Sequence, residues 1–246
     1  MSAVGIIPAR HASTRFPGKP LAEIAGVPML QRVFEQTRAA KRLSEVYVAT
    51  DDARIAAACS SFGAPVLMTS TEHPTGTDRL AEAAKQLDHD VVVNVQGDEP
   101  LIEGFVIDAA IDALLEDGET PMSTVVHALE DGARDDPNRV KVVLDRSGFA
   151  LYFSRSPIPY LRNASAGSPT WQHVGLYAYR RPFLLEFVRL ARTPAEQAEE
   201  LEQLRALEHG HRIRCAVVEG WTSTPVDVPA DVARVEARLA ARDRIR

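Results

Sequence analysis

The loop between Pro8 and Leu21 gathers three basic side chains in a chain whose formal net charge is -6. These side chains are Arg10, Arg15 and Lys19, and no acidic residue follows Pro8 until Glu23. A glycine and several small residues keep the backbone of the loop accessible. Such a loop suits a polyphosphate, because backbone N–H groups bind phosphate oxygens while Arg and Lys neutralise their charge. The alternative is a solvated basic loop that ends in two proline turns.

The sequence disfavours several functional classes. Neither GxxxxGK[ST] nor GxGxxG occurs in the loop, which argues against a P-loop ATPase or a dinucleotide enzyme. An acidic chain lacks the basic face that nucleic acid requires, so the basic loop indicates a small anionic ligand. No apolar run approaches the roughly 20 residues that cross a bilayer, and no secretion signal precedes Pro8, so we expect a cytoplasmic protein without membrane insertion. Cys59 and Cys215 do not have the spacing of a zinc site or a disulfide framework.

Alternating strands and helices should place the basic loop at one edge of a sheet. Val4–Ile7 and the valine run Val91–Val95 predict the first and fourth strands. The pattern between them predicts strands at Val46–Ala49 and Pro65–Met68, and helices around Leu30–Thr37, at Ala53–Phe62 and at about Arg79–Leu87. We therefore expect an α/β fold with a doubly wound, mostly parallel sheet in which strands one and four are neighbours. Ligands bind at the carboxyl ends of such strands, where Arg10, Lys19 and Asp98 should converge.

The second half of the chain predicts a smaller antiparallel hairpin region. Val140–Asp145 and Phe149–Ser154 flank a turn, and their apolar side chains suggest a homodimer contact. In the strand Gln172–Tyr179, alternation predicts that His173 and Tyr177 share a polar, wet face. The remaining elements are expected as helices at about Phe105–Leu115, Arg181–Ala191 and Ala195–His209, strands at Ser123–Ala128 and Ile213–Val218, and a final charged helix. No linker divides the chain, so we expect a single domain over residues 1–246.

Two aspartates are the best candidates for holding Mg²⁺, which takes one or two carboxylates together with phosphate oxygens and waters. Asp98 follows the carboxyl end of a buried strand. Its alternative role as a helix-cap acid is weakened by Pro100 and by the late start of the next helix. If Pro229 takes the first position of the final helix, Val228 is its cap and Asp227 lies one residue outside, free to point at a ligand.

Eight strings occur in order and nearly end to end. They are PARHASTRFPGKPL, HPTGTDRLAE, NVQGDEP, NRVKVVL, ALYFSR, HVGLYAYR, LEQLR and VDVPADV. Together they resemble the 3-deoxy-manno-octulosonate (Kdo) cytidylyltransferases. The resemblance implies a nucleotidyltransferase domain, usually a homodimer, that joins CTP and Kdo into CMP-Kdo and pyrophosphate for lipopolysaccharide biosynthesis. It also strengthens Asp227 as a metal ligand. Two features depart from the family: His11 stands where Tyr is usual, and the segment Leu161–Thr170 is short.

The reaction needs a triphosphate held in line with a nucleophile and a means of stabilising the departing pyrophosphate. We expect Arg10, Lys19, Asp98 and Asp227 to be catalytic, with Arg10 and Lys19 neutralising the β- and γ-phosphates. The second loop and Gln96 should meet the ribose and a small pyrimidine base. The expected nucleotide-binding residues are Ala9, Arg10, Arg15, Lys19, Thr75, Gly76, Thr77, Arg79 and Gln96. No general base is assigned, because a metal-bound anomeric hydroxyl can ionise without one.

Kdo brings a carboxylate and several hydroxyls, which suit a bidentate Arg and a set of hydrogen-bonding groups. The residues that fit by family position are Arg155, His173, Tyr177, Glu202 and Gln203, and Gln96 is also expected to bind the sugar. The structural alternative for His173 and Tyr177 is a polar outer face of a strand. For Glu202 and Gln203 it is a solvated helix face.

Two other functions remain open at this point. One is a nucleotidyltransferase for another sugar, such as 8-amino-Kdo, a sialic acid or a sugar phosphate. Enzymes for sugar phosphates usually open with a GxGTR-type loop, which this chain lacks. The other is a non-catalytic nucleotide-binding module. That function predicts loss of a charged site residue, whereas Arg10, Lys19, Asp98 and Asp227 are all present.

Overall fold

The computed structural model describes residues 1–12, 16–116, 118–163 and 170–243, which form two compact units. Unit 1 consists of Met1–Asp108 and Ser223–Arg246, and unit 2 consists of Ala109–Thr222. The chain passes from unit 1 to unit 2 within helix α4 (Gly104–Leu115). The expectation of a single domain over the whole chain stays a prediction.

Unit 1 is built on a parallel sheet with the strand order β6-β1-β4-β5. The strands are β1 (Ala3–Ala9), β4 (Glu45–Thr50), β5 (Val66–Met68) and β6 (Val91–Asn94). The first and fourth strands of the predicted pattern, β1 and β6, are neighbours as expected, with Val4 opposite Val92. The three valines of β6 are buried because helices cover both faces of the sheet.

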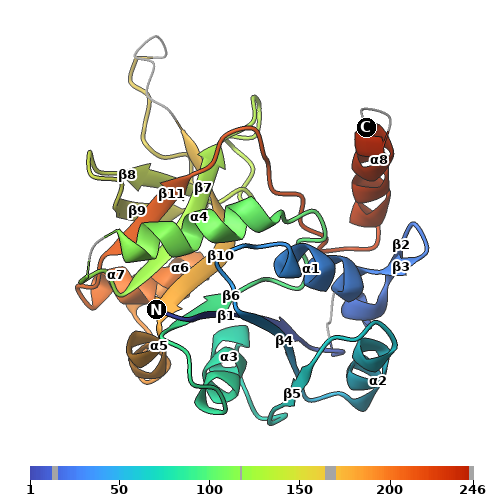
Figure 1. Ribbon diagram of the computed structural model, residues 1–246. Coiled ribbons are helices and arrows are strands. Elements are labelled where there is room, and N and C mark those ends of the chain that lie inside the picture. The colour runs from blue at the N-terminus through green and yellow to red at the C-terminus, as the bar shows by residue number, and fades with distance from the viewer. Residues whose placement is uncertain (13–15, 117, 164–169, 244–246) are drawn as a thin grey trace. The chain divides into compact units, whose positions relative to one another are not determined.

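Three helices flank this sheet: α1 (Met29–Arg38), α2 (Ala53–Ser61) and α3 (Gly76–Lys85). Figure 1 shows α1 above the strands and α3 below them, which is the doubly wound arrangement. The expected start of α3 at Arg79 is wrong. Thr75 caps the helix by accepting the N–H of Asp78, whose carboxylate accepts the N–H of Thr75 in return. This capping box starts the helix at Gly76.

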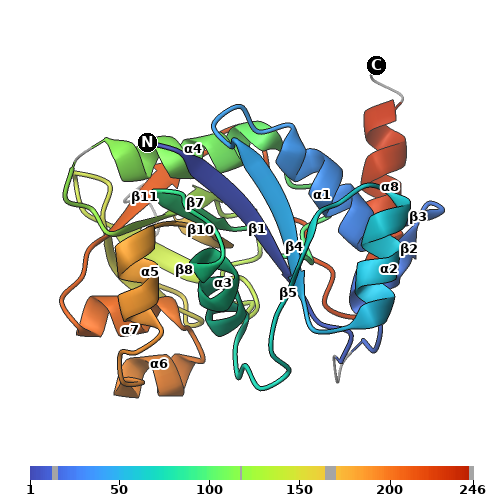
Figure 2. The ribbon, with the colours of Figure 1, turned by 60° about the horizontal axis from the view of Figure 1, so that its bottom comes forward.

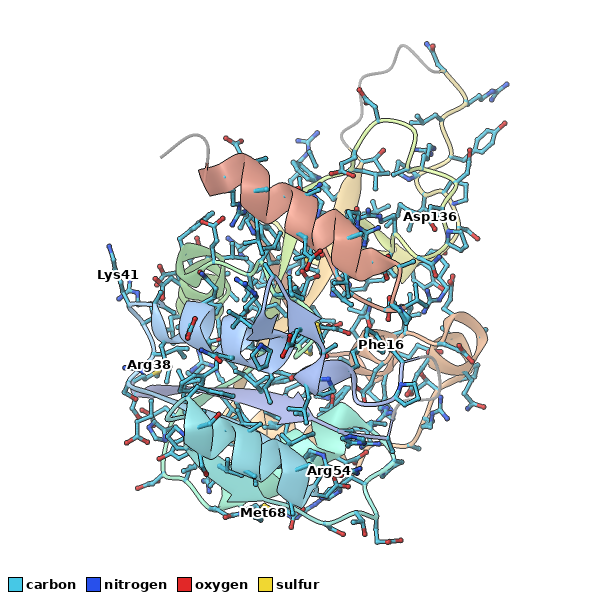
Figure 3. The ribbon with its side chains drawn as sticks, turned by 90° about the vertical axis from the view of Figure 1, so that its right-hand side faces the viewer. Phe16, Arg38, Lys41, Arg54, Met68 and Asp136 are labelled. Atoms are coloured by element: carbon cyan, nitrogen blue, oxygen red, sulfur yellow. The ribbon has the colours of Figure 1, made fainter. Side chains whose placement is uncertain are left out.

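A second core in unit 1 lies beside the C-terminal helix α8 (Asp231–Asp243). It joins Ile24, Met29, Leu101, Val226 and Val235, and Phe16, which Figure 3 labels, packs against it. Helix α8 runs beside the short strands β2 (Glu23–Ile24) and β3 (Val27–Pro28), as Figure 2 shows. The expected start of α8 at Pro229 is wrong, because the carboxylate of Asp231 accepts the N–H groups of Asp227 and Val228 and turns the chain first.

Unit 2 contains a mixed sheet and the predicted hairpin. Its strands are β7 (Met122–Ala128), β8 (Lys141–Leu144), β9 (Ala150–Ser154), β10 (Trp171–Arg180) and β11 (Ile213–Val217). Strand β7 pairs antiparallel with β10 and parallel with β11, while β8 pairs antiparallel with both β9 and β10. The α/β fold class, with a doubly wound parallel sheet and an antiparallel hairpin region, is confirmed.

Three short helices complete unit 2: α5 (Arg181–Phe187), α6 (Pro194–Glu199) and α7 (Gln203–Glu208). The single helix expected at Ala195–His209 is wrong. Glu200 has a φ of 51°, and this left-handed residue ends α6 before α7 begins beside it (Figure 2). None of the helices in the described residues combines the length and apolar character that a membrane crossing requires.

Candidate functional site

The ammonium of Lys19 lies between the two aspartates that were predicted to hold a metal. Lys19 Nζ donates to Asp98 Oδ2 at 2.9 Å and to the Val226 carbonyl at 2.9 Å, and lies 3.9 Å from Asp227 Oδ1. Lys19 begins the 3₁₀ helix η1 (Lys19–Leu21) directly after Gly18. The φ of 71° at Gly18 belongs to the left-handed region, which favours glycine and lets the loop fold back.

The end of β6 carries Asp98 into this cluster. Gly97 packs so closely on β1 that an added Cβ would lie 3.3 Å from the Pro8 carbonyl oxygen. The Asp98 carbonyl then accepts the N–H of Val226 at 2.9 Å. The buried carboxylate of Glu99 accepts the Ser223 hydroxyl and the N–H of Thr224. These bonds attach the segment that leads to Asp227 to the chain that follows β6.

The donor set in this cluster fits a magnesium ion. Asp98 and Asp227 supply two carboxylates around one ammonium, so the Lys19 side chain already occupies the position of a cation between them. Over the described ranges, no group of three or more His, Cys, Asp and Glu residues forms a complete metal site of its own. Two carboxylates are what Mg²⁺ uses when phosphate oxygens and waters complete its octahedral shell.

The second ligand loop is tied to the first by Arg10, which follows β1. The guanidinium of Arg10 donates to the Thr75 carbonyl at 2.5 Å and to the Pro74 carbonyl at 3.4 Å. Burial lowers the pKa of Arg10 and the nearby Arg79 lowers it further, while two aspartates oppose the shift. The loop before α3 is therefore fixed against the carboxyl end of β1.

Arg79 occupies a more enclosed position than its predicted role suggested. Its side chain is only 1% exposed, and its guanidinium lies 3.1 Å from the Asp51 carboxylate and donates to the Thr69 hydroxyl. These two partners follow β4 and β5, so Arg79 joins α3 to the carboxyl ends of both strands. Sequence reasoning did not single out Asp51, although its place after a predicted strand was the available signal.

The remaining predicted nucleotide residues lie at the same edge of unit 1, with one exception. Ala9 is the buried last residue of β1, and Gln96 lies in the turn after β6. Gly76 and the buried Thr77 open α3. Arg15 lies outside the described residues. Contact of these residues with a nucleotide stays a prediction.

In unit 2, Arg155 follows β9 and is held by backbone carbonyls. Its guanidinium donates to the carbonyls of Glu199 at 2.7 Å, Pro137 at 3.0 Å and Glu200 at 3.4 Å. The Glu199 carboxylate accepts the N–H of Arg155 at 2.9 Å and the hydroxyl of Ser154 at 2.5 Å. The orientation of Arg155 is thus set by two other chain segments, at Pro137 and at Glu199–Glu200, before any ligand arrives.

The predicted wet face of β10 is wrong. Tyr177 is 9% exposed and Tyr179 is 2% exposed, and the register against β7 shifts between Val174 and Tyr177. The His173 ring lies 5.1 Å from Phe153 and 5.4 Å from Tyr177 between ring centroids. Burial lowers the pKa of His173 to about 3, so the imidazole is neutral at ordinary pH.

Glu202 and Gln203 lie at the start of α7, close to this aromatic cluster. Burial raises the pKa of Tyr177 well above its usual value, and the neighbouring Glu202 carboxylate raises it further. Gln203 is 4% exposed, so a solvated helix face is wrong for this residue. Within the described residues, Nε2 of Gln203 and Nε2 of His173 are buried without a hydrogen-bond partner. Buried polar atoms of this kind are available to a ligand that brings hydroxyl groups.

Three charged residues that hold these segments in place were missed by sequence reasoning. Lys141 is fully buried in β8, and the buried pair Glu196–Arg205 joins α6 to α7 at 2.5 Å. For Lys141 the signal was a lysine inside the apolar run RVKVVL. The pair had no such signal, because charged residues are common in helices.

Comparison with known proteins places these features in a family. The sequence model described as "Cytidylyltransferase" matches residues 4–213. A protein of Syntrophotalea carbinolica named 3-deoxy-manno-octulosonate cytidylyltransferase is 53% identical over 97% of this chain and 99% of its own length. Its namesake in Geobacter metallireducens is 53% identical over 98% of both chains.

A solved structure agrees with the sequence comparison. The structure of CMP:2-keto-3-deoxy-manno-octonic acid synthetase complexed with CTP has a TM-score of 0.93 and 42% identity, and covers 98% of this chain and 100% of its own. The resemblance inferred from the eight sequence strings is thereby confirmed. The chain belongs to the cytidylyltransferase family, and within it to the 3-deoxy-manno-octulosonate cytidylyltransferases.

Proposed function

We propose that this protein transfers CMP from CTP to Kdo, giving CMP-Kdo and pyrophosphate. The names of relatives that are about half identical over nearly the whole chain support this reaction. The structural observation that carries it is the cluster of Lys19, Asp98 and Asp227 at the carboxyl edge of the parallel sheet. In this reaction the anomeric oxygen of Kdo bonds to the α-phosphorus of CTP while the bond from that phosphorus to pyrophosphate breaks.

The nucleotide is assigned to unit 1. Arg10 and Lys19 neutralise the triphosphate and stabilise the pyrophosphate as charge accumulates on it. Lys19 is bonded to carboxylates and a carbonyl in the free protein, so its ammonium exchanges these partners for phosphate oxygens when CTP binds. The loop before α3 and Gln96 meet the ribose and the cytosine, which gives the protein its preference for CTP.

Mg²⁺ is proposed as the cofactor, with Asp98 and Asp227 as its protein ligands. When bound, it supplies positive charge and orientation to the triphosphate. The two carboxylates fit this task because they lie at one edge of the sheet and already share a cation.

The acid sugar is assigned to unit 2. Arg155 offers a guanidinium for the sugar carboxylate, since its fork geometry matches a carboxylate in two parallel hydrogen bonds. His173 and Gln203 offer buried polar atoms for hydroxyl groups, and Tyr177 and Glu202 line the same cluster. His173 remains neutral, so it takes part as a hydrogen-bonding group and not as a charge.

We also propose that the protein is a cytoplasmic homodimer. The exposed side chains Leu151 and Tyr152 on β9 support association through the hairpin, because a strand that exposes apolar side chains favours contact with a second chain. Three other apolar side chains of the predicted hairpin, Val142, Phe149 and Phe153, are buried within the chain itself. The proposed contact is therefore smaller than the sequence pattern suggested.

The decisive experiment is release of pyrophosphate from CTP in the presence of a panel of acid sugars. The panel contains Kdo, 8-amino-Kdo and a sialic acid, and parallel reactions replace CTP with ATP or GTP. We expect the highest kcat/KM with CTP and Kdo, and no release without sugar. A higher kcat/KM for another acid sugar would replace Kdo in the proposal, and equal turnover with ATP or GTP would overturn the assignment of the base-binding loop.

A further inference from the structure

Lys141 is a fully buried lysine to which none of the roles proposed above is assigned. It lies in β8 with 0% of its surface exposed, although lysines are almost never fully buried without a partner. Its ammonium donates to the Asp136 carbonyl at 2.9 Å and to the Arg155 carbonyl. Throughout the described part of the chain, no carboxylate forms an ion pair with this ammonium.

The partners of Lys141 are also the surroundings of Arg155. Lys141 holds the carbonyl of Asp136, while the guanidinium of Arg155 holds the next carbonyl along the chain, that of Pro137, at 3.0 Å. The backbone of Lys141 pairs with Ser154, which directly precedes Arg155. The two cations therefore hold two consecutive carbonyls of one segment, and Lys141 also holds the main chain of Arg155 itself.

A purely structural role does not account for an ammonium at this position. Burying a charge costs free energy, and well-packed apolar side chains fill strand interiors without that cost. Burial lowers the pKa of Lys141, three nearby carboxylates raise it, and Arg155 lowers it. The buried Lys141 ammonium and the partly exposed Arg155 guanidinium together create a positive potential that an anionic ligand would relieve.

We propose that Lys141 is a positioning residue that holds Arg155 in the orientation needed to bind the carboxylate of the acid sugar. The inference rests on the proposed function, since it takes Arg155 as the carboxylate ligand. Lys141 itself does not touch the sugar in this proposal. It acts through the Arg155 main chain and through the turn at Asp136 and Pro137.

The test compares Lys141→Met with the parent enzyme and with Lys41→Met, a control at an exposed lysine of unit 1. Methionine keeps the length of the side chain and removes both donated hydrogen bonds. We expect KM for Kdo to rise about tenfold, the effect of about one lost charge-assisted hydrogen bond. KM for CTP should remain within about twofold, and Lys41→Met should match the parent in both constants.

A double-mutant cycle with Arg155→Gln separates this inference from the proposed function. If both residues act through the same guanidinium, the double variant should bind Kdo no more weakly than Arg155→Gln alone. A raised KM for Kdo in Arg155→Gln with an unchanged value in Lys141→Met would overturn the role of Lys141 and leave Arg155 in place. Unchanged values in both variants would reject Arg155 as the carboxylate ligand, and the inference with it.

Folding is the remaining control. Lys141→Gln retains an amide donor for the two carbonyls. It should therefore also raise KM for Kdo, but by a smaller factor than Lys141→Met does. Thermal unfolding is measured for each variant. Equal rises in KM for CTP and Kdo, or failure of both substitutions to fold, would assign Lys141 to folding alone and overturn the proposal.

Discussion

The ammonium of Lys19 donates to the carboxylate of Asp98 at 2.9 Å, although 79 positions separate the two residues. One was predicted to hold phosphate and the other to hold a metal ion. In the protein without substrates, the two side chains instead form an ion pair with each other. Asp227 lies 3.9 Å from the same ammonium, so the positive charge of Lys19 faces both carboxylates. A triphosphate that binds Lys19 would therefore bring new negative charge and also break the contacts of Lys19 with Asp98 and Asp227.

The first prediction concerns competition within this cluster. Lys19→Met removes the internal cation, so the free protein should bind Mg²⁺ or Mn²⁺ more tightly than the parent does. The same variant should turn over CTP more slowly by about 10² or more, the scale seen when one electrostatic stabiliser is lost. Titration with Mn²⁺ measures the first effect and initial rates measure the second. Weaker metal binding in the variant would contradict an arrangement in which Lys19 and the metal share the two carboxylates.

The second prediction concerns the two carboxylates. Asp98→Asn and Asp227→Asn retain size but remove a ligand charge, so kcat should fall by about 10² or more across a Mg²⁺ titration. The free energy of unfolding should change by less than about 1 kcal/mol, because partly exposed ion pairs contribute little. Asp88→Asn, at an exposed position, is the matched control. Near-normal kcat in either site variant would remove that residue from the metal site, and unfolding would indicate a structural role.

The third prediction is an acid-dependent loss of stability at His173. Its pKa is about 3 in the folded protein and near 6.5 in an unfolded chain, so below pH 6.5 the unfolded chain binds one more proton. Stability is therefore lost as the pH falls from about 6.5 toward 3, by at most about 1.4 kcal/mol per pH unit from this group.

The variant His173→Phe keeps an aromatic ring beside Phe153 and removes the titrating group. Urea unfolding at pH 6.5, 5.5 and 4.5 should show a weaker dependence on pH than in the parent. His209→Gln, at an exposed histidine, should leave the dependence unchanged. An identical pH slope in His173→Phe and the parent would show that His173 is protonated without penalty.

The fourth prediction concerns the buried pair Glu196–Arg205, which joins α6 to α7. Glu196→Gln leaves the Arg205 guanidinium buried without its main counter-charge, so the free energy of unfolding should fall by about 3 kcal/mol. Glu186→Gln, an exposed position on α5, is the control and should change it little. The double variant Glu196→Gln with Arg205→Met should lose less than the sum of its single changes, because it removes the unpaired charge. Additive losses would mean that the two groups do not interact.

The fifth prediction tests the proposed dimer. Leu151 is 61% exposed on β9, and Leu151→Asp places a charge on the expected contact. Sedimentation at several concentrations should shift from dimer to monomer in this variant. Val217→Asp, at another exposed apolar position of unit 2, should leave the dimer intact. A parent protein that remains monomeric at every concentration would remove the proposal, whatever the variants do.

The sequence alone determined the parallel sheet of unit 1 and the convergence of its site residues. Continuous valine and isoleucine runs indicate strands buried on both faces, and the carboxyl ends of neighbouring parallel strands must meet at one edge. The neighbouring positions of β1 and β6, and with them the approach of Lys19 to Asp98, follow from that rule. Local signals of this kind depend on residues close together in the chain.

Only the tertiary structure decided which polar residues are buried. Alternation along β10 favoured a wet face with His173 and Tyr177, but Tyr177 is buried near Glu202, which is distant in sequence. The single helix expected in the region of Glu200 is divided at that residue, which adopts a left-handed conformation that helical periodicity cannot reveal. Lys141 is charged in sequence and fully buried in the fold, since the carbonyls that accept its hydrogen bonds come from two other segments. Burial and hydrogen bonding across segments are properties of the packed chain, and no local pattern encodes them.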